Sequence, residues 1–242
     1  MPEKPCISLE HVSKRFGKKK VIEDVSLEVF RGEIFGMLGP SGAGKTTIVK
    51  MIAGIDEPTE GTIDVLNTKM PNLHVMKQIG FMAQSDALYN ELTALENLQF
   101  FASIYGLKGK KQKQRINEVM QLVNLTDHLK KSVSQFSGGM KRRLSLAVSL
   151  LHEPEVLILD EPTVGIDPLL RQAIWDELDR IRQKGTTIVV TTHVMDEADK
   201  CGRLAMIRDG RLIALGSPEE LKNRTNSRTI EEAFLYFGGA RQ

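Results

Sequence analysis

One stretch of nine residues constrains the fold of this chain more than any other. The segment GPSGAGKTT, residues 39–47, follows the apolar run EIFGML (33–38) and leads into KTTIVKMIAG (45–54). The apolar run predicts a buried strand, and the following pattern predicts a helix that ends at Gly54. A glycine-rich turn before a helix N-terminus presents backbone N–H groups and a favourable dipole to an anion. The segment therefore predicts a phosphate-binding loop, called the P-loop below.

The spacing within the P-loop indicates a nucleotide. Gly39, Gly44, Lys45 and Thr46 match the pattern G-x-x-x-x-G-K-[ST]. In this pattern the lysine reaches the β- and γ-phosphates, and the threonine hydroxyl coordinates Mg²⁺. We therefore expect the phosphates of a nucleotide and Mg²⁺ as ligands. The predicted nucleotide-binding residues of the loop are Gly39, Pro40, Ser41, Gly42, Ala43, Gly44, Lys45, Thr46 and Thr47.

Two acidic residues follow a second apolar strand, VLILDE (156–161). A carboxylate at the end of a buried strand can hold Mg²⁺ beside a P-loop, and Asp160 is the candidate. Glu161 is the candidate general base that polarises the attacking water. The alternative for Glu161 is an acid at a helix start or on the surface. The apolar strand before the pair favours the catalytic role.

Two further side chains are expected to face the same site. His193 ends the predicted strand TTIVVTT (186–192), and ligands of parallel sheets bind at the carboxyl ends of the strands. His193 is therefore predicted to lie near the γ-phosphate, although a single histidine is more often a structural hydrogen-bonding group. Gln84 follows QIGFMA, and its amide can reach Mg²⁺ or the water.

The middle of the chain has a helical pattern. Thr93 and Glu96 have the spacing of a capping box, and Gly106 is a helix stop. Ile116, Val119, Met120 and Val123 follow the i, i+3, i+4, i+7 spacing of an amphipathic helix. Residues of about 86–152 are therefore predicted to be all-helical and inserted into an α/β core. We expect the lysine-rich stretch 108–115 to be a solvated loop between these helices.

Two patterns complete the α/β core. Asp167 and Pro168 predict the start of a helix that ends at Gly185. The apolar residues of one side of this helix are Leu170, Ile174, Leu178 and Ile181. Asp209 and Gly210 predict a hairpin within LAMIRDGRLIALG.

A second candidate phosphate site lies in FSGGM, residues 136–140, called the signature motif below. Ser137 has a hydroxyl that can hydrogen-bond a phosphate oxygen, and Gly138 and Gly139 let the backbone approach it. The helix that follows points its positive end at an anion. Ser137 is also a good helix N-cap, which is compatible with ligand binding.

The order GPSGAGKT, Gln84, FSGGM, VLILDE, VGID, His193 resembles the nucleotide-binding domain of ATP-binding cassette (ABC) transporters over about residues 6–220. The resemblance implies an α/β P-loop NTPase (RecA-like) core with a mainly parallel sheet. An N-terminal antiparallel β subdomain and an inserted α-helical subdomain accompany this core. The predicted boundaries are one domain over 1–220, with the core at 1–85 and 153–220, the helical subdomain at about 86–152, and a short helical tail at 221–242.

The resemblance also implies why two phosphate sites occur in one chain. In this family two copies, identical or homologous, pair head to tail, and each ATP lies between the P-loop of one and the signature motif of the other. Phe16 matches the aromatic residue that stacks on adenine, and Asp167 in VGID matches the loop that contacts the other copy. Gln84 matches the loop that couples the nucleotide site to the membrane subunit. Phe136 and Met140 replace the first and last residues of the usual LSGGQ.

The function that this resemblance implies is ATP hydrolysis that powers export. The segments ELTALENLQFFASIYGL and TIEEAFLYFGG are similar to those of drug- and antibiotic-resistance exporter ATPases, whose transmembrane permease is a separate chain. We therefore expect a peripheral protein on the cytoplasmic face of the cell membrane. The alternatives are an importer ATPase, a ribosome- or DNA-associated ABC ATPase, and a P-loop kinase. The sequence does not name the cargo.

Composition narrows these classes further. Lys plus Arg is 33 and Asp plus Glu is 31, so the chain lacks the basic excess that favours nucleic acid, and we expect no such partner. The N-terminal residues lack the apolar region of a signal peptide, and the apolar stretches are far shorter than the roughly 20 residues that cross a bilayer. The two cysteines, Cys6 and Cys201, fit a reducing compartment.

Overall fold

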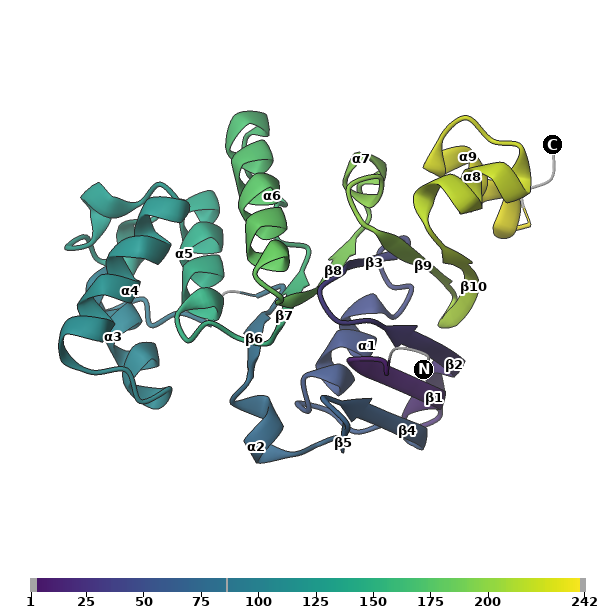
Figure 1. Ribbon diagram of the computed structural model, residues 1–242, viewed down its shortest axis with the longest axis horizontal. Coiled ribbons are helices and arrows are strands. Elements are labelled where there is room, and N and C mark those ends of the chain that lie inside the picture. The colour runs from purple at the N-terminus through teal and green to yellow at the C-terminus, as the bar shows by residue number, and fades with distance from the viewer. Residues whose placement is uncertain (1–3, 86, 240–242) are drawn as a thin grey trace.

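The computed structural model describes residues 4–85 and 87–239, and its centre is a six-stranded sheet (Figure 1). The strand order is β10-β9-β3-β8-β7-β6, in which β9, β3, β8, β7 and β6 are parallel and β10 is antiparallel. Parallel strands place their carboxyl ends at one edge of the sheet, so this order brings the ends of β3, β8, β7 and β6 together. The strands are β3 (Ile34–Leu38), β6 (Ile79–Met82), β7 (Val156–Asp160), β8 (Thr187–Thr192), β9 (Arg203–Arg208) and β10 (Arg211–Gly216).

The central strands are buried on both faces, as apolar parallel strands require. Every residue of β3, β7 and β8 is buried. Successive side chains of a strand point to opposite faces, so each strand contributes to two separate cores. In β3, for example, Ile34 and Leu38 join one core, and Phe35 and Met37 join the other.

One face of the six-stranded sheet is covered by α1 (Lys45–Ile52) and a second sheet. The second sheet is antiparallel, with the order β2-β1-β4-β5. Buried side chains of α1 and of both sheets form a single apolar core, so α1 is held between two layers. The strands of this sheet are β1 (Ile7–Phe16), β2 (Lys19–Val29), β4 (Glu60–Val65) and β5 (Thr68–Lys69).

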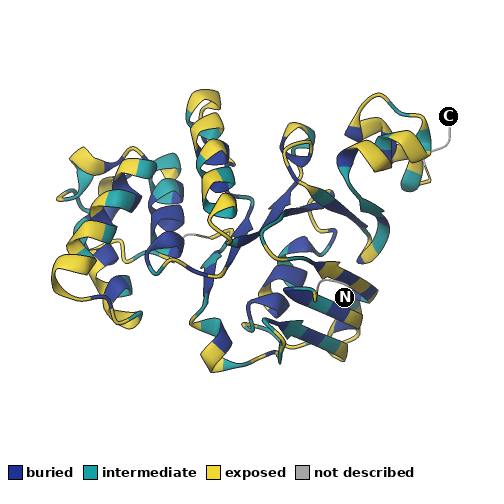
Figure 2. Ribbon diagram, viewed as in Figure 1, coloured by how far each residue is buried: buried dark blue, intermediate teal, exposed yellow. Residues whose placement is uncertain are grey.

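The remaining helices contribute to the other core, except for α2, whose buried Val75 belongs to the core around α1. The described elements within 94–150 are helical, and α3, α4 and α5 pack against one another at one end of the molecule (Figure 1). Figure 2 shows that these helices expose their outer faces, whereas the central strands are buried. The helices are α2 (Leu73–Met76), α3 (Ala94–Ile104), α4 (Gly109–Leu122), α5 (Gly138–Leu150), α6 (Pro168–Gln183) and α7 (Met195–Ala198), with 3₁₀ turns at Thr126–His128 and Val133–Gln135.

Local signals explain most helix ends. The capping box at Thr93 and Glu96 is confirmed, and its Thr93 N–H donates to Glu96 Oε2 at 2.7 Å. Gly54, Gly106 and Gly185 follow α1, α3 and α6 with φ of 75°, 76° and 101°. A left-handed residue after a helix ends it at no steric cost when that residue is glycine.

The predicted loop at 108–115 is wrong, because α4 begins at Gly109. Lysine, glutamine and arginine are good helix formers, and their charge does not prevent helix formation on a solvated face. Lys110, Lys111 and Lys113 are exposed, while Ile116 and Val119 on the same helix are buried. The amphipathic helix α4 therefore includes the lysine-rich segment as its solvated first half.

The chain after β10 forms α8 (Pro218–Thr225) and α9 (Ile230–Phe237), which pack together. The boundary predicted at 220 falls inside α8, which begins at Pro218 behind a capping box of Ser217 and Glu220. Among the described residues, no helix combines the length and the apolar character that crossing a membrane requires.

Candidate functional site: a nucleotide-binding edge of the central sheet

The P-loop joins the end of β3 to the start of α1 and has the backbone that the sequence pattern demands. Gly42 and Gly44 are left-handed, with φ of 81° and 104°. Gly39 is required for a different reason, because a Cβ there would overlap the carbonyl oxygen of Ile207. The loop is therefore pressed against β9 on one side, which fixes its shape.

Lys45 is buried inside this loop. Its Nζ donates to Gly39 O at 2.6 Å and to Pro40 O at 3.1 Å. Burial lowers the pKa of Lys45 below its usual value, and the charges of Glu161 and Asp160 oppose that shift. An ammonium group held by two carbonyls is ready to exchange them for stronger anionic acceptors.

Asp160 ends β7 and is fully buried. Its Oδ1 accepts a hydrogen bond from the Thr191 hydroxyl on β8, whereas its Oδ2 has no hydrogen-bond partner among the described residues. A buried carboxylate oxygen without a donor is costly unless a cation or water satisfies it. Mg²⁺ prefers oxygen ligands, so Asp160 with the half-buried Thr46 hydroxyl fits a magnesium site.

Glu161 lies next to Asp160 in a left-handed conformation, with φ of 53°. Its N–H donates to the carbonyl and hydroxyl oxygens of Thr191, each at 3.1 Å. Its Oε1 lies 3.0 Å from His193 Nδ1, and its Oε2 lies 3.5 Å from Gln84 Nε2. The structure thus brings together side chains that follow β6, β7 and β8, and they surround one carboxylate.

The signature motif lies in a different environment. Ser137 is the N-cap of α5 and accepts from the Met140 N–H at 3.2 Å. Ser137 and Gly138 are exposed, and a Cβ on Gly139 would lie 3.1 Å from Gly165 O in the VGID segment. Within the described residues no hydrogen bond joins Ser137, Gly138 or Gly139 to the P-loop.

Asp167 and Phe16 make their described contacts with residues other than Asp160, Glu161 and His193. Asp167 is the N-cap of α6, and its Oδ1 accepts from Leu170 N–H at 3.0 Å. Phe16 ends β1 and is 52% exposed, with Lys14 Nζ at 5.0 Å from its ring centroid. An exposed ring of this kind has a face available for stacking.

Two residues that touch the site were not predicted. Thr191 holds both Asp160 and Glu161, as described above. Arg142 on α5 is 7% exposed and donates to backbone carbonyls of the Gln84 segment and of Asp160 and Glu161. The available signal for Arg142 is its position in α5, where buried Ser145 and Ser149 follow at i+3 and i+7.

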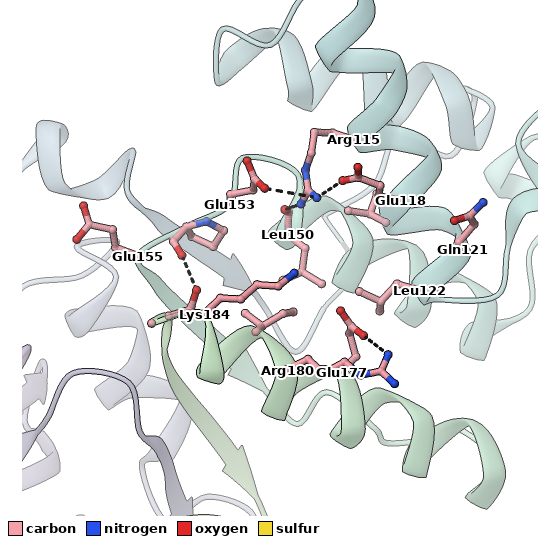
Figure 3. Close-up of a pocket in the computed structure, with 15 residues that line it drawn as sticks. Arg115, Glu118, Gln121, Leu122, Leu150, Glu153, Glu155, Glu177, Arg180 and Lys184 are labelled. Atoms are coloured by element: carbon pink, nitrogen blue, oxygen red, sulfur yellow. Dashed lines mark hydrogen bonds and ion pairs between the residues drawn. The ribbon is translucent and has the colours of Figure 1, made fainter.

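A cavity of about 710 Å³ lies away from this site, between α4 and α6 (Figure 3). Glu155 and Thr186 line it, and they immediately precede β7 and β8. The cavity therefore lies at the amino ends of these strands, whereas Asp160 and His193 lie at the carboxyl ends. It is not part of the nucleotide site.

The fold and this edge define an α/β nucleotide-binding domain of the P-loop class. A family model described as ABC transporter matches residues 22–164. The chain is 40% identical over 241 residues to the probable multidrug ABC transporter ATP-binding protein YbhF of Escherichia coli (strain K12), covering 97% of this chain and 42% of the relative. It is 40% identical over 240 residues to the linearmycin resistance ATP-binding protein LnrL of Bacillus subtilis (strain 168), covering 95% of this chain and 77% of the relative.

A solved structure supports the same assignment. The dimeric ATP-binding cassette MJ0796, in a post-hydrolysis state bound to ADP and Pi, superposes with a TM-score of 0.82 at 28% identity, covering 87% of this chain and 98% of that chain. The chain belongs to the ABC transporter family, and it is an ABC ATPase domain. The predicted family and fold class are therefore confirmed. The chain spans 42% of the length of YbhF.

Proposed function

We propose that this chain binds ATP with Mg²⁺ and hydrolyses it to power export through a separate transmembrane subunit. The observation that carries the hydrolytic part is the arrangement around Glu161. Its carboxylate lies 3.0 Å from His193 and 3.5 Å from Gln84, beside a buried Asp160 oxygen that lacks a donor. Such a group of side chains supports transfer of phosphate to water.

Each residue of the site has a proposed role. Bound Mg²⁺ would neutralise charge on the β- and γ-phosphates. Asp160 and Thr46 would hold the ion, with Gln84 as a further oxygen ligand. Lys45 would leave its two loop carbonyls for the phosphates, and Glu161 would take a proton from the attacking water while His193 holds the transferred group. Phe16 would stack on the adenine, and backbone N–H groups of 39–47 would bind the phosphates.

We propose further that two cassettes act as a head-to-tail dimer. Ser137, Gly138 and Gly139 would bind the γ-phosphate of the partner's ATP, and Asp167 would contact the partner. The exposure of Ser137 and Gly138 supports this role, as does the dimeric state of MJ0796. The partner cassette is a second copy or a homologous chain.

The helical region of about 86–152 would connect these events to a permease at the cytoplasmic face of the membrane. Tyr89, Phe100 and Ile104 are exposed apolar side chains, and the rings of Tyr89 and Phe100 lie 4.9 Å apart. A cluster of exposed apolar side chains is typical of an interaction surface. Export rather than import is supported by the names of YbhF and LnrL, which refer to a multidrug ABC transporter and to linearmycin resistance.

Phosphate release from ATP tests the enzymatic proposal. The purified protein with Mg²⁺ is expected to release inorganic phosphate without an acceptor molecule, since water is the acceptor. Release that requires an added acceptor would indicate a kinase instead. Omission of Mg²⁺ is expected to stop the reaction, and a full rate without it would contradict the assignment of Asp160.

Affinity purification from native membranes tests the transport proposal. The tagged chain is expected to recover a polytopic membrane protein from detergent extract. Phe100→Asp with Ile104→Asp is expected to abolish this recovery, whereas Asn117→Asp on the exposed surface of α4 serves as the matched control. Recovery of ribosomes or DNA in place of a membrane protein would contradict the proposal.

A further inference from the structure

We propose that Arg142 is a positioning residue that fixes Glu161 and the Gln84 segment relative to the signature helix α5. The inference rests on the proposed function, because it concerns the alignment of the groups that activate water. Arg142 itself touches neither Glu161's carboxylate nor the P-loop in the described contacts. It acts on the backbone that carries the reactive side chains.

The guanidinium group joins the ends of two neighbouring parallel strands. Its Nη1 donates to Ala83 O at 2.7 Å and to Gln84 O at 2.9 Å, just beyond β6. Its Nη2 donates to Asp160 O and, at 2.6 Å, to Glu161 O, at the end of β7. Four backbone carbonyls from two segments therefore share one cation.

These contacts require an arginine. The guanidinium presents donors on a rigid planar fork, so that one side chain can serve acceptors on two sides at once. A lysine ammonium offers three donors around a single point and cannot span the same set. Arg142 is almost fully buried, so its carbonyl partners cannot turn to bulk water when it is removed.

The backbone of Glu161 needs such restraint. A glutamate with φ of 53° is in a sparsely populated region, which persists only where the surroundings hold it. Thr191 holds the N–H of this residue, and His193 and Gln84 lie against its carboxylate. Arg142 donates to the Glu161 carbonyl. Of these contacts with Glu161, the one made by Arg142 comes from the signature helix α5.

This placement links the two phosphate sites of one chain. Ser137 and Arg142 are five residues apart on one helix, or about 7.5 Å along its axis at 1.5 Å per residue. A short helix moves as a rigid element, so a shift of Ser137 also shifts Arg142. When α5 is displaced, the carbonyls of Gln84 and Glu161 lose or regain their donors. Binding of a partner's nucleotide at Ser137 would thereby set the position of Glu161 in the chain's own site.

The next residue supplies a matched control. Arg143 Nη1 donates to Val123 O and Asn124 O, each at 3.1 Å, at the end of α4. It is an arginine on the same helix with carbonyl partners, but its partners belong to the helical region. Its removal perturbs packing of α5 without touching the Gln84 or Glu161 segments.

Steady-state kinetics separate positioning from general stability. Arg142→Met is expected to lower kcat about 100-fold, the scale of a misplaced catalytic group, while KM for ATP changes little. Arg142→Lys is expected to restore part of kcat, and Arg143→Met to leave kcat nearly unchanged. If Arg142→Met fails to fold, Arg142→Gln and Arg142→Lys provide the same comparison. Equal effects of Arg142→Met and Arg143→Met on kcat and KM would overturn the proposal.

Hydrogen exchange measured by mass spectrometry tests the same contacts without any hydrolysis. Arg142→Lys is expected to speed exchange in peptides that contain 81–85 and 160–164, and Arg143→Lys to speed it only near 121–125. This readout remains valid even if the unmodified protein releases no phosphate, in which case the proposed function alone would fail. Unchanged exchange in both segments of the Arg142 variant would show that α5 does not hold them.

Discussion

The P-loop and the signature motif are both built from small residues at the start of a helix, yet they differ in how complete they are. The P-loop is closed around its own lysine, and Gly39 is in close contact with β9. The signature motif is exposed at Ser137, and a Cβ on Gly138 would meet no atom within 4 Å. The P-loop is enclosed by other parts of the same chain, whereas the signature motif leaves open space for a second molecule.

The chemical groups follow the same division. Asp160, Glu161 and His193 lie at the carboxyl ends of β7 and β8, at the same edge of the sheet as the P-loop. The described neighbours of Gly139 include the VGID segment instead. The proposed composite site needs an asymmetric pair of this kind, since the P-loop surface would supply the proposed reactive groups and the signature motif only complementary hydrogen-bond donors. Variants that alter only one of the two motifs should therefore affect different properties of the protein.

Removal of the proposed base should affect only the chemistry at the first site. Glu161→Gln is expected to lower kcat by about 10²–10⁴-fold, because an amide cannot accept the proton from water. Affinity for ATP should be retained, since the P-loop is unchanged. Phosphate release and equilibrium binding of a fluorescent ATP analogue measure the two quantities. Near-normal turnover would remove Glu161 from its role.

Damage to the second site should leave ATP binding intact and prevent pairing. In the Glu161→Gln background, ATP is expected to convert the 27.0 kDa monomer to a species of twice that mass, measured by light scattering. Ser137→Arg should abolish this change because its side chain fills the open surface with positive charge and bulk. Ser103→Arg on the exposed part of α3 is the control for added charge. A dimer that forms in spite of Ser137→Arg would show that the signature motif does not face the partner.

Replacement of a glycine by alanine should destabilise the P-loop but not the signature motif. Gly39→Ala is expected to lower the free energy of unfolding by about 2–3 kcal/mol, since the new methyl group overlaps the Ile207 carbonyl. Gly138→Ala lies in open space at the first helical position and should be neutral or stabilising, within about 1 kcal/mol. Urea denaturation of both variants measures the difference. Equal destabilisation would mean that the signature loop is as tightly packed as the P-loop.

The far end of the signature helix should show a small pH effect. His152 follows α5, its ring stacks on Tyr105 at 3.6 Å, and His152 Nε2 lies 3.2 Å from Ile79 O. Burial lowers its pKa to about 4, and the nearby Arg115 charge acts in the same direction. As the pH falls, His152 therefore becomes protonated in the unfolded chain before it does in the folded chain. The contribution of neutral His152 to stability is complete above its ordinary pKa of about 6.5 and is lost as the pH falls toward 4.

This effect is expected to amount to about 1–2 kcal/mol between pH 7 and pH 5. His152→Phe keeps the stacked ring and should remove that part of the pH dependence. The difference between the two proteins in urea denaturation at both pH values isolates His152 from other titrating groups. An identical pH dependence in the two proteins would contradict the lowered pKa.

Short sequence patterns were sufficient to predict a structural feature where one residue type suits one backbone conformation. The P-loop spacing, the capping box at Thr93 and the glycines after α1, α3 and α6 could be predicted because each depends on neighbours within a few residues. The strands β3, β7 and β8 were predictable from their apolar runs, and the parallel arrangement then placed Glu161 and His193 at one edge. The lysine-rich start of α4 could not be predicted in this way, because charge alone does not distinguish a loop from a solvated helix face.

The family, the class of fold and the position of the nucleotide loop follow from the sequence, since those depend on short motifs in a fixed order. Which side chains and backbone groups contact one another follows only from the folded structure. Arg142 donates hydrogen bonds to Ala83, which is 59 positions away in the sequence, and to Glu161, which is 19 positions away. The Thr191 hydroxyl donates to Asp160, which is 31 positions away. Such contacts are set by the packing of α5 on the ends of β6 and β7 and by the pairing of β7 with β8. A backbone carbonyl also carries no sequence signature, so its partner can be found only when the chain is folded.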